Sequence, residues 1–221
     1  MKSRMGLTFT LLRERNDPAQ ILIKLALRNA LLDCESVLDI GCGASPTMRQ
    51  LGVPRVFGLE GYRPSFEEAK RRNTHDEIVF GDVRDLASFF KPRQFDACVA
   101  LDLIEHLTKP QGLKLLAEME SIAKKKVVLF TPSGFLPQRH ASRDDLEEHL
   151  SGWDASEMAG LGYRVEGFLG PRSLRGEYHV LNRRPRLFWS IVSLFGHIFG
   201  THNQPEKAAA ILCVKDLDRS G

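Results

Sequence analysis

The stretch Val37-Leu38-Asp39-Ile40-Gly41-Cys42-Gly43 decides the fold of this chain. An apolar run that carries one acid, Asp39, leads into two glycines. Glycine at such a point lets the backbone come close to a ligand and permits a positive φ angle. The pattern therefore indicates a strand that turns into a helix and binds a nucleotide-like cofactor at the turn.

Two more acids follow apolar runs further along the chain. Glu60 comes after Val56-Phe57-Gly58-Leu59, and Asp82 comes after Ile78-Val79-Phe80-Gly81. Because ligands of open α/β sheets bind at the carboxyl ends of the strands, we expect these acids and Asp39 to gather around one ligand.

The elements alternate between strands and helices. Asp17 as N-cap and Pro18 at the first helical position predict a helix from 17 to about 32. Short apolar runs rich in Val, Ile and Phe predict buried parallel strands at 37–40, 56–59, 78–80 and 95–101. Helices are expected from Pro46, with Ser45 as its N-cap, from Pro64 and from Pro110.

Three later apolar runs, at 127–131, 163–169 and 209–214, complete the sheet. The last two lack an ordinary crossover, so we expect them to pair antiparallel at the sheet edge. The predicted fold class is α/β: a doubly wound, mostly parallel seven-stranded sheet with an antiparallel last strand and helices on both faces.

Length and composition agree with one domain of 221 residues. We divide it into an N-terminal helical cap (1–35), a cofactor-binding half (37–132) and an acceptor-side half (133–221) with a helical insertion at about 171–207. The composition, 43% hydrophobic and 27% charged, is typical of a soluble globular protein. Four cysteines without metal-ligand spacing, and no apolar leader in the first ten residues, predict the cytoplasm.

Taken together, the landmarks resemble the class I S-adenosylmethionine-dependent methyltransferases. The matching segments are Val37 to Gly43, Gly58-Leu59-Glu60, Gly81-Asp82-Val83, and Phe95 to Leu107 with its Asp102-Leu103-Ile104-Glu105-His106-Leu107 end. The resemblance implies S-adenosyl-L-methionine as cofactor. Many relatives carry a third glycine soon after Gly43, where this chain has Ala44-Ser45-Pro46-Thr47.

The resemblance also implies roles for the cofactor-binding residues. Glu60 would accept hydrogen bonds from both ribose hydroxyls, as acids at about this distance from the glycines do in dinucleotide folds. Asp82 would accept from the adenine amino group, and the Val83 amide would meet a ring nitrogen. Asp39 would bond the ammonium group of the methionine part. The remaining expected contacts are Gly41, Cys42, Gly43, Gly61 and Leu101, the last packing on the adenine or lining its pocket.

Methyl transfer from a sulfonium depends mainly on positioning, and a base helps when the acceptor atom is an oxygen. His106, with an ordinary pKa near 6.5, is the leading candidate for that base, and Glu105 is the second. The alternative is that this segment only begins a helix, with His106 bonding the backbone and Glu105 meeting solvent or an arginine.

His149 and Trp153 are expected in the acceptor pocket or in loop packing. Trp153 has the further alternative of an ordinary core aromatic. We predict no metal site, because Glu147, Glu148 and His149 are consecutive and would fan out around a helix.

The apolar stretch from Leu187 to Phe199 carries a narrow polar stripe of Ser190, Ser193 and His197. It is shorter than the roughly 20 residues that span a bilayer. With Arg183, Arg184 and Arg186 before it, the segment 183–199 fits a peripheral membrane helix. The commoner alternative is a helix buried against the domain, over the pocket or in a dimer interface.

The main hypothesis is a methyltransferase for a small-molecule acceptor, methylated at oxygen. A nucleic-acid acceptor is disfavoured, because Phe130-Thr131-Pro132-Ser133 stands where amino-methylating nucleic-acid enzymes carry an Asn- or Asp-Pro-Pro-aromatic run. A lipid-associated methyltransferase, a nicotinamide dehydrogenase and a non-catalytic scaffold remain as alternatives. The oligomeric state stays open.

Overall fold

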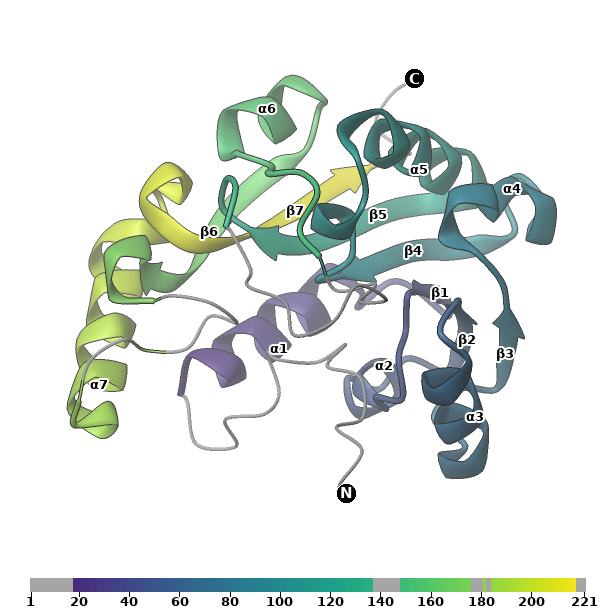
Figure 1. Cartoon of the computed structure of the whole chain (residues 1–221), viewed down its shortest axis with the longest axis horizontal. Coiled ribbons are helices and arrows are strands. Elements are labelled where there is room, and N and C mark those ends of the chain that lie inside the picture. Colours follow the sequence, from purple (N-terminus) through teal and green to yellow (C-terminus); the bar gives the residue numbers. More distant parts are fainter. Residues whose placement is uncertain (1–17, 137–147, 176–180, 182–183, 218–221) are drawn as a thin grey trace.

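The computed structural model describes residues 18–136, 148–175, 181 and 184–217 (Figure 1). Its centre is a seven-stranded sheet in the order β3-β2-β1-β4-β5-β7-β6. Strands β1 to β5 are parallel, and β7 runs antiparallel to both of its neighbours. The predicted fold class is therefore confirmed. The strands are β1 Ser36–Ile40, β2 Arg55–Glu60, β3 Glu77–Phe80, β4 Phe95–Leu101, β5 Ala123–Pro132, β6 Arg164–Pro171 and β7 Ala208–Asp216.

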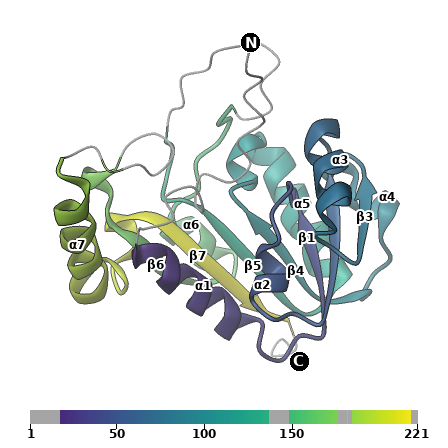
Figure 2. The same ribbon diagram turned by 90° about the horizontal axis from the view of Figure 1, so that it is seen from below.

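Helices cover both faces of the sheet (Figures 1 and 2). On one face, Leu27 of α1 and Met48 of α2 pack into the same apolar cluster as Val37. On the other face, α4, α5 and α6 pack against Leu38 and its neighbours. The α-helices are α1 Pro18–Ala30, α2 Thr47–Gln50, α3 Arg63–Arg72, α4 Leu86–Phe89, α5 Lys109–Ile122, α6 Ala155–Gly160 and α7 Arg186–Gly196, and short helical turns are η1 Val83–Asp85, η2 Ile104–His106, η3 Arg172–Leu174, η5 His197–Thr201 and η6 Pro205–Lys207.

Three helix starts differ by one residue from the expectation: α3 begins at Arg63 and α5 at Lys109, each one residue before the predicted proline, and α2 begins one residue after it. The predicted N-cap of α2 was Ser45, but the helix begins at Thr47 and Pro46 is its N-cap. The Ser45 hydroxyl lies 2.7 Å from the Thr47 hydroxyl, and this side-chain hydrogen bond takes the place of a cap on the backbone. The expected N-cap of α1, Asp17, lies outside the described residues.

Trp153 joins the acceptor-side half to the core. Its side chain is fully buried, and its indole nitrogen donates to the Ser151 hydroxyl at 3.0 Å and to the Ile104 carbonyl at 3.3 Å. A Cβ on Gly112 of α5 would lie 2.4 Å from the indole ring, so glycine is needed there for the two to pack. In this structure Trp153 is a buried core aromatic, which is the alternative that the sequence left open for it.

Helix α7 lies beside β6 at the edge of the sheet and contacts α1 (Figures 1 and 2). Its polar stripe faces inward: Ser193 is fully buried and donates to the Leu169 carbonyl at 2.8 Å. Apolar side chains face outward, with Phe188 55% and Ile191 44% exposed. The helix therefore packs against the domain through its polar stripe, while these apolar side chains stay exposed. Within the described part of the chain, every helix is too short or too polar to cross a bilayer.

The packing of Trp153 predicts a large effect of its removal. We expect Trp153→Ala to lower the free energy of unfolding by about 3–5 kcal/mol, since the change leaves a cavity and an unfilled contact on Gly112. Urea denaturation measures this value. Leu32→Ala is the control, because that side chain is 71% exposed and its loss should change stability by less than about 0.5 kcal/mol. An equal effect of both substitutions would contradict the core role.

Candidate active site

The glycine loop after β1 has the backbone that its sequence predicts. Gly41 and Gly43 have φ angles of +64° and +54°, which side chains disfavour. The Gly41 amide donates to the Leu59 carbonyl at 2.8 Å. A Cβ on Gly41 would lie 2.8 Å from Leu103, so the segment after β4 packs directly on this loop.

Glu60 connects the glycine loop to the end of β2. Its carboxylate accepts from the Gly43 amide and from the Tyr62 amide, each at 2.7 Å. The residue is buried, and this burial raises the pKa of its carboxyl, while the two amides oppose the rise. Close behind it, a Cβ on Gly61 would lie 3.1 Å from the Gly81 carbonyl. Glu60 and Gly61 thus lie where β1, β2 and β3 end together.

Asp39 has a buried partner that the sequence did not reveal. His75, in the loop before β3, places its Nε2 3.3 Å from the Asp39 carboxylate. A carboxylate only accepts, so Nε2 donates, and Nδ1 lies 2.8 Å from the Thr74 hydroxyl. This chain of hydrogen bonds fixes the Asp39 side chain inside the protein.

Cys42 and Gly58 explain why β2 contains a glycine. A Cβ on Gly58 would lie 2.8 Å from the Cys42 sulfur and 3.1 Å from the His75 ring. Burial raises the pKa of the Cys42 thiol well above its ordinary value, and the charges of Asp39 and Glu60 add to the rise. The thiol is therefore a neutral packing group beneath the loop.

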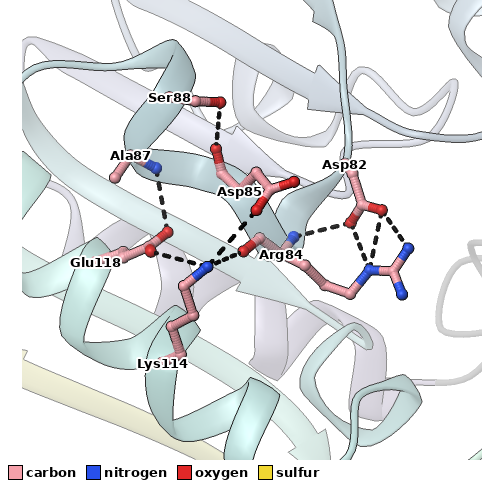
Figure 3. Close-up of polar contacts among 7 residues, drawn as sticks. All are labelled: Asp82, Arg84, Asp85, Ala87, Ser88, Lys114 and Glu118. Atoms are coloured by element: carbon pink, nitrogen blue, oxygen red, sulfur yellow. Dashed lines mark hydrogen bonds and ion pairs between the residues drawn. The ribbon is translucent and has the colours of Figure 1, made fainter.

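Asp82 is held by a neighbouring arginine (Figure 3). Both of its oxygens accept from Arg84 Nε at 2.9 Å, and Oδ1 also accepts from the Arg84 amide at 2.9 Å. The Arg84 guanidinium lowers the pKa of the Asp82 carboxyl. Val83, the first residue of η1, is half-buried.

The turn that contains Asp82 is also fixed to α5 (Figure 3). Lys114 forms ion pairs with Asp85 at 3.7 Å and with Glu118 at 3.4 Å. The Glu118 carboxylate accepts from the Ala87 amide at 3.1 Å. These contacts hold Asp82 and Val83 in place at the edge of the sheet.

Leu101, at the end of β4, is 7% exposed and packs in the cluster of α1 and α2. Asp102 follows it with a φ angle of +48°, which is unusual outside glycine. This strained residue turns the chain into η2 and so directs Glu105 and His106 away from the strand.

Glu105, His106 and His149 form a cluster, although the sequence separates His149 from the other two by more than 40 residues. One potential ligand atom from each lies within 4.8 Å of the others, and the two imidazole rings meet edge to face with centroids 4.9 Å apart. Glu105 and His149 are buried, and His106 is half-buried. The structure thus brings the two base candidates together with one acceptor-pocket candidate.

Backbone hydrogen bonds hold this cluster, which we call the Glu-His-His cluster. The Glu105 carbonyl accepts from the amides of Leu150 at 2.8 Å and Ser151 at 3.1 Å. The Thr131 hydroxyl of β5 donates to the Glu105 carboxylate at 2.9 Å. In these contacts buried Glu105 meets a hydroxyl and two amides, whereas His106 bonds the backbone at the Glu148 carbonyl, as the alternative for this segment expects.

Both imidazoles donate through the same ring nitrogen. His106 Nδ1 lies 3.2 Å from the Glu148 carbonyl, and His149 Nδ1 lies 2.7 Å from the Leu136 carbonyl. A carbonyl can only accept, so each Nδ1 carries the hydrogen. In the neutral ring Nε2 then has the lone pair.

Burial changes the acidity of the two carboxyl groups near η2. It raises the pKa of Glu105 to about 6, while His149 and Thr131 oppose the rise. It raises the pKa of Asp102 well above its ordinary value, with the charge of Glu105 as the second cause. Two buried acids therefore share a region with little water.

The raised pKa of Glu105 predicts a pH dependence of stability. The folded state holds this proton more tightly than the unfolded state, so the contribution is present below pH 4.5 and is lost as the pH rises to about 6. We expect the stability of wild type relative to Glu105→Gln to fall across this range. Urea unfolding at a series of pH values measures the difference.

Glu67→Gln is the matched control, because Glu67 is an exposed acid that pairs with Arg63 across one turn of α3. A difference between wild type and Glu105→Gln that does not change between pH 4.5 and pH 6 would contradict the raised pKa.

Comparison with known proteins agrees with this architecture. Residues 38–131 match the family model described as a methyltransferase domain. No curated protein sequence matches the chain. Many solved structures share the fold, among them three at 16% identity or less.

The first is a putative sarcosine dimethylglycine methyltransferase from Galdieria sulphuraria, with 16% identity, a TM-score of 0.57 and coverage of 89% of this chain and 83% of that one. The second is a SAM-dependent methyltransferase from Archaeoglobus fulgidus, with 14% identity, a TM-score of 0.53 and coverage of 89% and 93%. The third is magnesium protoporphyrin IX methyltransferase from Synechocystis with bound SAH, with 11% identity, a TM-score of 0.50 and coverage of 90% and 83%.

The matched segment contains the glycine loop, Glu60, Asp82 and Glu105, which are the residues that form the site described above. Residues 38–131 thus match the model of a methyltransferase domain, and the seven-stranded sheet has the fold of solved S-adenosylmethionine-dependent methyltransferases.

Proposed function

We propose that this protein transfers the methyl group of S-adenosylmethionine to a hydroxyl oxygen of a small molecule. The Glu-His-His cluster carries this proposal, because an oxygen acceptor must lose a proton as it attacks and these side chains can assist. Leu103, which packs on Gly41, lies only two residues before Glu105. The cluster is therefore attached to the same segment that contacts the cofactor loop.

The carboxylates at the strand ends support the roles assigned to them. Glu60 already accepts two amides and keeps lone pairs for the ribose hydroxyls. Asp82 is ionised beside Arg84 and can accept from the adenine amino group. Asp39, oriented by His75, can bond the ammonium group of the methionine part.

The alternatives differ in what they require of the chain. A nucleic-acid acceptor would need a basic surface, and the formal net charge is only +3. A scaffold would need neither base nor acceptor. The four cysteines are free and buried, which favours a reducing compartment such as the cytoplasm.

Cofactor binding can be tested through Glu60. We expect Glu60→Ala to weaken binding of S-adenosylhomocysteine by about 10–100-fold, because hydrogen bonds to a charged group contribute about 1.5–3 kcal/mol. Calorimetric titration measures this affinity, with NAD as the control ligand. Glu67→Ala, an exposed acid on α3, should bind like wild type. Unchanged affinity in a folded Glu60→Ala protein would contradict the assigned role.

The base role can be tested with a panel of hydroxyl-containing acceptors and labelled cofactor. Loss of His106 should lower kcat by about 10²–10⁴-fold while binding of S-adenosylhomocysteine stays the same, since general bases contribute that much. His202→Gln is the control, a histidine that lies in the β6–β7 connection. Transfer to amines alone would contradict an oxygen acceptor, and the absence of any transfer would favour the scaffold.

The exposed face of α7 favours a second property, which is peripheral contact with an anionic membrane. Phe188, Ile191 and Ile198 are 55%, 44% and 52% exposed, and exposed Arg184 precedes the helix. We expect Phe188→Ser with Ile191→Ser to reduce sedimentation with vesicles that contain phosphatidylserine. Leu32→Ser, at an exposed position outside α7, should have no effect. Equal sedimentation of both variants and wild type would contradict the contact.

A further inference from the structure

We propose that Glu105, His106 and His149 bind one divalent transition-metal ion, and that this ion holds the oxygen of the acceptor. The first part stands on the geometry of the Glu-His-His cluster. The second part rests on the proposed function, since it names how the hydroxyl group would be activated.

The distances bring the three side chains close to coordination range. Nitrogen and oxygen ligands lie about 2.0–2.2 Å from a zinc-like ion, so two ligands of one ion are at most about 4.4 Å apart. The potential ligand atoms lie within 4.8 Å of one another. A movement of a few tenths of an ångström, which side-chain rotation supplies, closes the site around an ion.

Each candidate ligand also has the outer partner that metal ligands need. Metal-binding histidines donate their second ring nitrogen to a carbonyl or carboxylate, and ligating carboxylates accept a hydrogen bond of their own. His106 and His149 donate through Nδ1 to backbone carbonyls, and Glu105 accepts from Thr131. Since these bonds use Nδ1 of both rings, the proposal assigns coordination to Nε2.

The main chain holds the two halves of the cluster together without an ion. The amides of Leu150 and Ser151 donate to the Glu105 carbonyl, and buried Trp153 donates to the Ile104 carbonyl. His149 is therefore placed against η2 by contacts of three residues that follow it in the chain. A preformed site of this kind requires little reorganisation when it binds a metal.

The donor set indicates the class of ion. Two imidazoles and one carboxylate suit zinc, iron, cobalt or manganese, whereas magnesium and calcium prefer oxygen ligands alone. Three protein ligands leave coordination positions open, as in catalytic metal sites. An acceptor oxygen can occupy such a position.

The methyl transfer from the cofactor to the acceptor hydroxyl needs no further reactant. An acceptor hydroxyl bound to the ion becomes more acidic and releases its proton to solvent. The oxygen then attacks the methyl carbon, the carbon–sulfur bond breaks, and its electron pair stays on sulfur as S-adenosylhomocysteine. In the metal-free alternative, His106 accepts the proton directly and no ion is bound.

Cobalt binding tests the proposal without depending on turnover. Full-length protein is treated with EDTA, dialysed and titrated with Co²⁺, followed by calorimetry and by the visible absorption of the bound ion. We expect one equivalent of Co²⁺ to bind, and its visible absorption bands to be typical of nitrogen ligands. Affinity should fall about 10–100-fold or more in His106→Ala, His149→Ala and Glu105→Gln, since even outer partners contribute that much. Zn²⁺ should compete for the same site.

His202→Gln is the matched control, because it removes a histidine outside the cluster and should leave Co²⁺ binding unchanged. Circular dichroism shows whether each variant is folded, and Thr131→Val removes only the outer partner of Glu105, so it should weaken binding less than Glu105→Gln. Absence of stoichiometric Co²⁺ binding by folded wild type would overturn the proposal. Equal binding by the His106→Ala/His149→Ala double variant would also overturn it.

Two further measurements separate this failure from failure of the proposed function. Methylation that continues unchanged in EDTA-treated protein would reject the metal role and keep the methyltransferase function. Stoichiometric Co²⁺ binding with no transfer to any hydroxyl acceptor would keep the metal site and reject the oxygen acceptor.

Discussion

The backbone carbonyl of Glu105 accepts two amides, and the active-site side of the molecule depends on this interaction. It joins the turn after β4 to the segment around residue 150, which Trp153 also links to Ser133 and Gly134 at the end of β5. Trp153 reinforces the junction by filling the space over Gly112 and bonding the carbonyl of Ile104. The sheet therefore positions His149 through η2 and through the segment after β5, where the Leu136 carbonyl accepts from its Nδ1.

The carboxyl ends of β1, β2 and β3 are stabilised in a different way. There the polar groups at the strand ends are satisfied by the protein itself: Glu60 by two amides, Asp39 by His75 and Asp82 by Arg84. Fixing a carboxylate in advance lowers the conformational cost of binding a ligand. The acids gathered by β1, β2 and β3 are thus already oriented by the protein itself.

The sequence predicts the sheet and the glycine loop well, because buried parallel strands and positive-φ glycines depend on local residue types. The sequence predicts less well those features that tertiary contacts determine. Strand β5 begins at Ala123 and not at 127, since Lys125 and Lys126 leave the apolar pattern but form ion pairs with Asp96 and Asp33. Three features depend on residues far apart in the chain: the contact of His149 with Glu105, the hydrogen bond of His75 to Asp39, and the packing of the polar stripe of α7 on β6. The local sequence pattern carries no signal for such contacts.

The packing of Cys42 on Gly58 has a practical consequence. The thiol is buried and neutral, and it lies between the glycine loop and the floor of β2. Only the thiolate reacts readily with alkylating reagents, and it forms only when the loop lifts away from the strand. The rate at which Cys42 becomes labelled therefore reports how often the loop opens, so the protein carries its own probe of local unfolding at the cofactor site.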